Sequence, residues 1–246
     1  MLAQIGANFA NDYFDFKRGA DTKQRLGPKR AVASGQVSPG AMLVATLMVL
    51  ALAALAGCAL IPYGGWPLVA IGVSSLLAAY AYTGGPFPLA YHGLGEVCTL
   101  VFYGFVAVIG TYIVQARWPA PPAAWMAGSG CGLLATNILL INNIRDMAED
   151  TRAGKRTLVV RIGRKAAQRL YGFNLIFALL MPLLFFAIGS SAFVLLPLLL
   201  APYGHLLYKS LGAAPEGDGR VFNKLLGFSA QLLALWAAFF ALGIAF

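Results

Sequence analysis

Two short segments of the sequence concentrate its acidic side chains. They read NDYFDFKRGAD at residues 11–21 and NNIRDMAED at residues 142–150, in a chain that has only nine aspartates and glutamates among 246 residues. Carboxylates placed this closely repel one another unless a cation lies between them. A hard divalent ion such as Mg²⁺ takes oxygen ligands and is usually held by one or two carboxylates together with substrate phosphates. Both segments therefore indicate metal–phosphate chemistry.

The spacing within each segment places these polar side chains on one face of a helix. Residues four apart in an α-helix lie on the same side, which aligns Asn11 with Asp15 and sets Asn142, Asp146 and Asp150 in a single stripe. Two such stripes that face each other could hold metal ions on a diphosphate, and nearby Lys and Arg side chains would neutralise the remaining phosphate charge. The alternative interpretation is that the acids pair with neighbouring cations in a loop.

The composition is that of a membrane protein. The chain is 59% apolar and only 11% charged, with a mean hydropathy of +0.74, whereas about 25% of the residues in a soluble domain are charged. The net charge of +9 needs no nucleic acid to explain it, because membrane topology accounts for it. Three cysteines lie in apolar runs without metal-ligand spacing and form no disulfide framework: Cys58, Cys98 and Cys131.

Hydrophobic runs long enough to cross a bilayer account for most of the chain. A span needs about 20 apolar residues to cross about 30 Å of hydrocarbon. The opening run, at about residues 1–14, forms a shorter helix that does not cross comfortably. Ser38 followed by Pro39 predicts a capped helix start. We expect seven full spans, at roughly 40–61, 66–82, 96–116, 123–143, 169–188, 191–208 and 224–246.

The distribution of positive charge predicts the topology. Threading the short helix and the seven spans puts all Lys and Arg residues except Arg117 on one side of the membrane. Cytoplasmic loops carry the excess of Lys and Arg, so the long loops are expected to be cytoplasmic and both termini external. Both acidic segments share the cytoplasmic side, where a lipid diphosphate would present its head group.

Four segments together resemble the UbiA superfamily of intramembrane prenyltransferases, and more narrowly its 1,4-dihydroxy-2-naphthoate polyprenyltransferase branch. They are NDYFDFKRGADT, RAVASGQVSP, YTGGPFPLAYHGLGE and NNIRDMAEDTRAGKRTL. The resemblance covers essentially the whole chain. It implies an all-α, polytopic transmembrane bundle of about eight helices, with a central lipid-accessible cavity, formed as one domain over residues 1–246.

The same resemblance assigns roles to residues of both motifs. The catalytic carboxylates would be Asp12, Asp15, Asp146 and Asp150. The ligands of Mg²⁺ would be Asn11, Asp12, Asp15, Asp21, Asp146 and Asp150. The residues that bind the substrate diphosphate would be Asn11, Lys17, Arg18, Asn142, Arg145, Lys155 and Arg156.

The implied activity is transfer of a polyprenyl group from an allylic diphosphate to 1,4-dihydroxy-2-naphthoate with decarboxylation, which gives a demethylmenaquinol in menaquinone synthesis. The partners would be polyprenyl diphosphate, the aromatic acceptor and the bilayer, with no nucleic acid and no protein partner. The expected location is the cytoplasmic (inner) membrane, as a multi-pass protein. Other acceptors in the superfamily remain alternatives: 4-hydroxybenzoate, homogentisate, haem or chlorophyllide.

A transporter is the alternative from a different class of protein. Transport sites usually place ionisable residues near the bilayer midplane, but the middle of each predicted span has no Asp, Glu, Lys or Arg. His92 lies beside Glu96 in the segment LAYHGLGE, where a role in ring binding or proton transfer competes with that of a solvated loop histidine.

One departure from the resemblance concerns the N-terminus. Members of the superfamily usually have nine spans, and the first precedes the N-terminal aspartate motif. This chain begins ten residues before Asn11, so we expect that it lacks the first helix, through truncation or a mis-assigned start.

Overall fold

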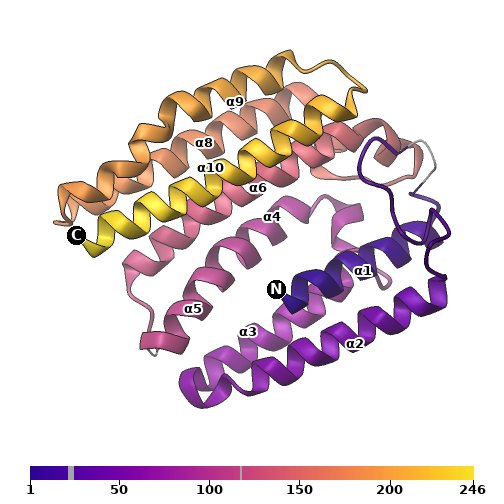
Figure 1. Ribbon diagram of the computed structural model, residues 1–246, viewed down its shortest axis with the longest axis horizontal. Coiled ribbons are helices and arrows are strands. Elements are labelled where there is room, and N and C mark those ends of the chain that lie inside the picture. The colour runs from indigo at the N-terminus through magenta and orange to yellow at the C-terminus, as the bar shows by residue number, and fades with distance from the viewer. Residues whose placement is uncertain (22–24, 117) are drawn as a thin grey trace. The chain divides into compact units, whose positions relative to one another are not determined.

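The chain folds as a set of helices in a computed structural model that describes residues 1–21, 25–116 and 118–246 (Figure 1). Within these ranges no residue is in a β-strand, so the all-α prediction is confirmed. Arg117, the one cation predicted on the external side, lies outside the described residues. The elements are α1 (Leu2–Lys17), α2 (Pro39–Cys58), α3 (Ile61–Ala81), η1 (Leu89–His92), α4 (Gly95–Thr99), η2 (Leu100–Val106), α5 (Ala107–Ala116), α6 (Pro122–Arg152), α7 (Leu158–Ile162), α8 (Arg164–Ala187), η3 (Ala192–Leu200), α9 (Ala201–Ala213) and α10 (Gly219–Ala245).

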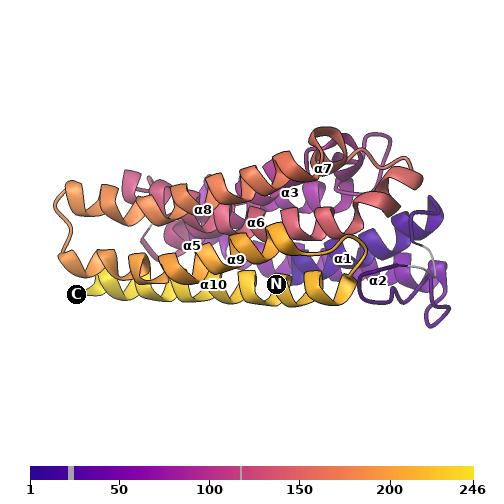
Figure 2. The same ribbon diagram turned by 90° about the horizontal axis from the view of Figure 1, so that it is seen from above.

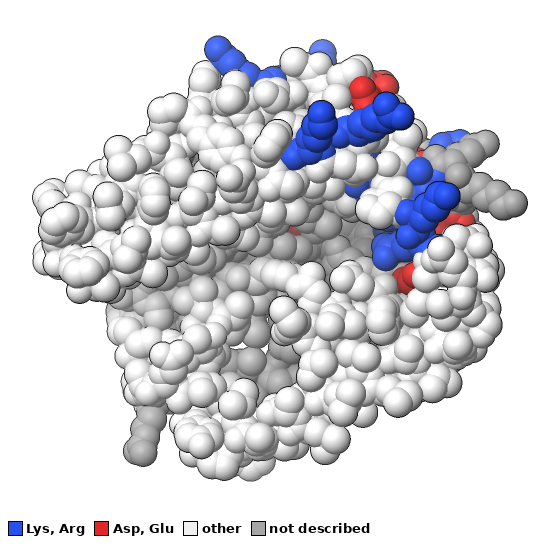
Figure 3. Space-filling model, in the orientation of Figure 1, with Lys and Arg blue, Asp and Glu red and all other residues white. Residues whose placement is uncertain are grey.

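Seven helical stretches among the described residues are long and apolar enough to cross a membrane, as the sequence predicts. They are Pro39–Cys58, Ile61–Ala81, Gly95–Ala116, Pro122–Arg152, Arg164–Ala187, Ala192–Ala213 and Gly219–Ala245. Helix α1 has 16 residues and corresponds to the short opening run. On the face shown in Figure 3, uncharged side chains cover the long helices, and charged side chains lie toward helix ends and loops. The prediction of a polytopic helical membrane protein is therefore confirmed.

The helices form two compact units. The first unit contains residues 1–98, 110–120 and 146–161, and the second contains residues 99–109, 121–145 and 162–246. Helix α6 is continuous from Pro122 to Arg152, so its long apolar part belongs to the second unit and its last two turns to the first.

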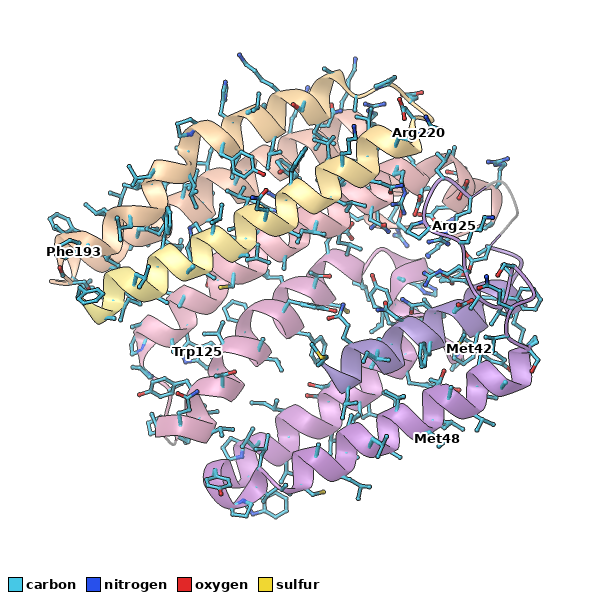
Figure 4. All side chains as sticks on the ribbon, in the orientation of Figure 1. Arg25, Met42, Met48, Trp125, Phe193 and Arg220 are labelled. Atoms are coloured by element: carbon cyan, nitrogen blue, oxygen red, sulfur yellow. The ribbon has the colours of Figure 1, made fainter. Side chains whose placement is uncertain are left out.

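In the first unit, α1, α2 and α3 pack against one another. Gly6 of α1 allows the close approach of α2, because a Cβ at this position would lie 2.6 Å from Leu50 Cδ2. Helix α2 begins as predicted, with the Ser38 hydroxyl accepting a hydrogen bond from the N–H of Ala41 at 3.2 Å. One face of α2 is inside and the other outside: Met42 is buried and Met48 is 61% exposed (Figure 4). The exposed apolar face suits contact with lipid.

In the second unit, α8, α9 and α10 run side by side (Figures 1 and 2). Buried polar side chains link three helices within this apolar packing. The Asn137 amide of α6 donates to the Tyr171 carbonyl at 3.0 Å and accepts from Asn174 of α8 at 3.0 Å. The Tyr171 hydroxyl lies 3.0 Å from the Ser229 hydroxyl of α10. Because hydrocarbon offers no alternative partner, such hydrogen bonds specify how membrane helices pair.

One close helix contact in the second unit depends on small residues. Gly104 lies in η2, which is a π-helix, and a Cβ there would lie 2.5 Å from the Gly128 carbonyl oxygen and 2.7 Å from the Gly132 Cα of α6. These neighbours are backbone atoms, which cannot move aside as a flexible side chain can. Glycine is therefore required for η2 to reach α6.

We expect the substitution Gly104→Ala to destabilise the protein by about 1–3 kcal/mol, because the added methyl group overpacks a backbone contact. Thermal unfolding of the purified protein in detergent measures the effect. Gly72→Ala on α3 is the matched control, since a Cβ at Gly72 would meet no atom within 4 Å. Equal melting temperatures for the Gly104→Ala variant and the unsubstituted chain would contradict the assigned packing.

Candidate active site

The two acidic segments meet in the first unit. The Lys155 ammonium lies 3.4 Å from Asp15 Oδ2 and 3.9 Å from Asp150 Oδ1, so one cation links α1 to the end of α6. The four aspartates assigned a catalytic role are all buried, with exposed fractions of 6% for Asp12, 3% for Asp15, 7% for Asp146 and 8% for Asp150. The expectation that the two clusters lie together is therefore met by the geometry, although 135 positions separate Asp15 from Asp150.

Lys155 is held in place by the way α6 ends. Gly154 has a φ of +69°, the left-handed conformation that glycine adopts without strain. The N–H of Gly154 donates to the Thr151 carbonyl at 3.2 Å, and the N–H of Lys155 donates to the Asp150 carbonyl at 2.8 Å. This is a Schellman helix end. It reverses the chain and directs the Lys155 side chain back toward the acids of the helix it has just left.

The neighbouring carboxylates stabilise the positive charge of Lys155. Burial by itself lowers the pKa of a lysine, but the carboxylates of Asp15 and Asp150 outweigh that effect and raise the pKa of Lys155 above its usual value. The side chain therefore stays protonated at neutral pH, and it shares its single positive charge between two buried carboxylates.

Asp12 organises the chain that follows α1. Its Oδ2 accepts the N–H of Ala31 at 3.0 Å, and its Oδ1 accepts the N–H of Val32 at 3.2 Å. Val32 is itself buried, so the carboxylate anchors the segment RAVASG onto the helix. Each carboxylate oxygen has a second lone pair, so a metal role for Asp12 stays a prediction alongside this observed role.

Asp21 and Glu149 also contact the loop that follows α1. Asp21 accepts a hydrogen bond from Arg25, labelled in Figure 4, and lies 3.7 Å from Arg30 Nε. Burial raises the pKa of Asp21, although both arginines act against the rise. Glu149 Oε1 accepts the N–H of Leu26 at 3.1 Å. For Asp21, the alternative interpretation of acids paired with nearby cations describes the geometry, and its assignment as a metal ligand remains a prediction.

Tyr91 connects both motifs to the loop between α3 and α4. Its hydroxyl donates to Asp15 Oδ1 at 2.9 Å. Its ring carries the Arg18 guanidinium at 4.9 Å and the Lys155 ammonium at 5.3 Å from the centroid, and its carbonyl accepts the N–H of Arg156 at 3.1 Å. Burial and the negative charge of Asp15 raise the pKa of Tyr91, so the phenol stays a hydrogen-bond donor. In the sequence, nothing distinguishes Tyr91 from the other aromatic residues, because its position has no helical spacing to either motif.

Asn11 and Arg18 also contact the loop after α3. Asn11 Oδ1 accepts the hydroxyl of Thr83 at 2.8 Å. Arg18 donates to the carbonyl of Thr83 and, at 2.9 Å, to that of Gly85. These two residues were predicted to bind diphosphate or metal, and the structure shows them positioning the segment TGGP against α1. Only the tertiary structure reveals Thr83 as their partner.

The remaining predicted diphosphate ligands fall into two groups. Lys17 and Arg156 are exposed cations in the first unit, and the Lys17 ammonium lies 3.4 Å from the hydroxyl of Tyr13. Arg145 belongs to the second unit, where it is buried and donates to Asn142 Oδ1 and Asn223 Oδ1, both at 2.7 Å. Arg145 thus ties α6 to α10, and the binding roles of Arg145 and Asn142 remain predictions.

The imidazole of His92 has a defined orientation. Its Nδ1 lies 2.9 Å from the Pro88 carbonyl, and its ring stacks on Phe87 with centroids 3.7 Å apart. A carbonyl only accepts, so Nδ1 donates, and Nε2 of the neutral ring is the acceptor. Both interpretations of His92 stay predictions.

The donor set suits a metal that arrives with phosphate. The buried ligands are carboxylate oxygens, which Mg²⁺ prefers. Among the residues described, no group of three His, Cys, Asp or Glu side chains forms a ready-made metal cage. Mg²⁺ normally completes its octahedron with phosphate oxygens and water rather than with an all-protein cage. The residues therefore fit Mg²⁺ bound jointly by the two motifs and a diphosphate.

Comparison with known proteins identifies the family. Residues 1–226 match the profile of the UbiA prenyltransferase family.

The chain belongs to the UbiA prenyltransferase family.

Among the relatives of this UbiA-family chain are proteins named 1,4-dihydroxy-2-naphthoate octaprenyltransferase. The one from Escherichia coli is 40% identical over 174 residues, which cover 68% of this chain and 56% of the relative. The one from Mycobacterium tuberculosis is 36% identical over 246 residues, which cover 98% of this chain and 81% of the relative. A UbiA prenyltransferase domain-containing protein 1 from Danio rerio is 30% identical over 99% of this chain and 70% of its own length. The chain thus spans little more than half of the Escherichia coli relative.

We expect Tyr91→Phe to lower the free energy of unfolding of this UbiA-family chain by about 1.5–3 kcal/mol, because buried Asp15 loses a donor to its charged oxygen. Hydrogen exchange in segments 83–94 and 153–157 is expected to rise, since Tyr91 joins both. Thermal unfolding and exchange mass spectrometry measure the two effects. The matched control is Tyr63→Phe, at a side chain that is 62% exposed; a result identical to that control would refute the role assigned to Tyr91.

Proposed function

We propose that this chain transfers a polyprenyl group from an allylic diphosphate to 1,4-dihydroxy-2-naphthoate and forms a demethylmenaquinol. The bond between the allylic carbon and the diphosphate oxygen breaks, and the diphosphate leaves with the electron pair. A ring carbon of the acceptor forms the new carbon–carbon bond, and the acceptor carboxylate is lost as CO₂. The names of the relatives from Escherichia coli and Mycobacterium tuberculosis support this choice of acceptor.

The observation that carries the proposal is the convergence of Asp15 and Asp150 on one buried ammonium. We propose that Mg²⁺ is held by Asn11, Asp12, Asp15, Asp21, Asp146 and Asp150, with Asp12, Asp15, Asp146 and Asp150 as the catalytic carboxylates. When bound there, Mg²⁺ supplies Lewis-acid neutralisation of the leaving diphosphate.

The basic side chains complete the proposed site. Lys155, Lys17 and Arg156 lie in the same unit as the buried acids and would bind diphosphate oxygens through charge-assisted hydrogen bonds. We propose the same role for Asn11, Arg18, Asn142 and Arg145 in the state with substrate bound. Tyr91 orients the Asp15 carboxylate through its hydroxyl. The prenyl tail of the substrate would lie among the membrane-spanning helices, away from water, which protects the allylic cation.

Exchanging the carboxylates for amides tests the proposal. We expect Asp15→Asn and Asp150→Asn each to reduce prenyl transfer on the order of 100-fold or more, because several kcal/mol of charge stabilisation are lost. The assay uses membranes with labelled polyprenyl diphosphate, 1,4-dihydroxy-2-naphthoate and Mg²⁺, and EDTA is expected to abolish the product. Glu216→Gln is the matched control, at a side chain that is 81% exposed.

Two results would overturn the proposal. Wild-type activity in both amide variants would remove the assigned metal role of the aspartates. Product formed with 4-hydroxybenzoate but not with 1,4-dihydroxy-2-naphthoate would replace the acceptor while leaving the metal role in place. Elution volume and melting temperature in detergent establish that each variant is folded.

We further propose that the motifs face the cytoplasm in the cell membrane, which the distribution of Lys and Arg supports. A cysteine introduced as Lys17→Cys is expected to react with a membrane-impermeant maleimide in inverted vesicles and not in intact cells. Tyr63→Cys, on the opposite side in this topology, is expected to show the reverse pattern, and the unsubstituted chain sets the background. Labelling of Lys17→Cys from outside intact cells would invert the topology.

A further inference from the structure

Lys155 occupies the position of a counter-ion shared by the two motifs. Its ammonium lies within 4 Å of one carboxylate oxygen from each motif, 3.4 Å from Asp15 Oδ2 and 3.9 Å from Asp150 Oδ1. The Lys155 side chain is only 16% exposed, and the Asp15 and Asp150 side chains are 5% and 11% exposed. Few water molecules can therefore screen these charges, and the single positive charge of the lysine is shared between the two acids.

The backbone fixes the start of the Lys155 side chain but does not itself hold the ammonium group. The N–H of Lys155 donates to Asp150, and the N–H of the next residue, Arg156, donates to Tyr91. The ammonium itself is at the end of a four-carbon chain with rotatable bonds. It is a compact charge that can donate hydrogen bonds to any nearby acceptor. The Tyr91 ring, 5.3 Å away, offers a broad electron-rich face along which the ammonium can shift while it stays stabilised.

This arrangement competes with metal coordination by the same carboxylates. Mg²⁺ binds carboxylate oxygens at about 2.0–2.1 Å. A divalent ion on Asp15 and Asp150 would lie very close to an ammonium that also contacts both, and the repulsion between like charges is strong where water is scarce. The ammonium and the metal therefore compete for the position between these two acids.

We propose that Lys155 is a displaceable counter-ion that makes metal binding depend on diphosphate. The lysine holds Asp15 and Asp150 together and keeps the divalent ion from binding by itself. A diphosphate supplies a new acceptor for the ammonium, which moves onto the phosphate oxygens and leaves both carboxylates to the metal. Metal and diphosphate therefore bind as a pair. This inference rests on the proposed function, because it takes Asp15 and Asp150 as metal ligands.

Binding of Mn²⁺ without diphosphate tests the inference. Electron paramagnetic resonance of free Mn²⁺ gives its affinity for the full-length protein in detergent. We expect Lys155→Met and Lys155→Gln to bind Mn²⁺ at least ten times more tightly than the unsubstituted chain, because the competing charge is gone. Lys155→Arg keeps that charge and is expected to show no such gain. Lys165→Met, at an exposed lysine of the second unit, is the control and is expected to leave the affinity unchanged.

The second measurement is binding of labelled inorganic pyrophosphate at saturating Mg²⁺, which is expected to weaken at least tenfold in Lys155→Met and to stay unchanged in Lys165→Met. Substitution of a residue that only supports the fold would not tighten the binding of one ligand while weakening the binding of the other. Mn²⁺ binding that is equal or weaker in both neutral variants overturns the inference. If those variants bind Mn²⁺ more tightly but the unsubstituted chain transfers no prenyl group, the counter-ion role stands and the proposed function fails.

Discussion

The burial of carboxylates from two distant segments is the constraint around which the first unit is built. Asp12, Asp15, Asp146 and Asp150 are all removed from water, and a buried carboxylate is very costly unless cations or hydrogen-bond donors compensate its charge. The observed donors differ in kind: backbone N–H groups for Asp12, a phenol and an ammonium for Asp15, and the same ammonium for Asp150. A chain with few acids thus places them where compensation is possible.

The loops follow from this constraint. The segment after α1 is tied to Asp12, Asp21 and Glu149. The loop between α3 and α4 is tied to α1 through Thr83 and Tyr91, and the turn after α6 is tied to that loop through the backbone of Arg156. Acids and loops hold each other in place. A change that loosens these loops would therefore also alter the conformation of the proposed site.

Helix α6 contains both an apolar stretch long enough to cross the membrane and the second acidic segment. Its apolar part is packed in the second unit, where Asn137 and Arg145 bond to α8 and α10. Its last two turns carry Asp146 and Asp150 into the first unit. Within these two turns, Asp146 and Asp150 are four residues apart and therefore lie on the same face of the helix.

The sequence by itself determined the features that depend on neighbouring residues. Apolar runs gave the seven spans, Ser38 and Pro39 gave the start of α2, and four-residue spacing aligned Asp146 with Asp150, because helix periodicity and capping are local. The family resemblance added the expectation of metal and diphosphate. Only the tertiary structure decided that Asp12 anchors a backbone, that Arg18 and Asn11 hold the loop at Thr83, and that Tyr91 and Lys155 join the two motifs. These contacts link residues far apart in the chain, and no spacing rule predicts which distant side chains the packing of helices brings within hydrogen-bond distance.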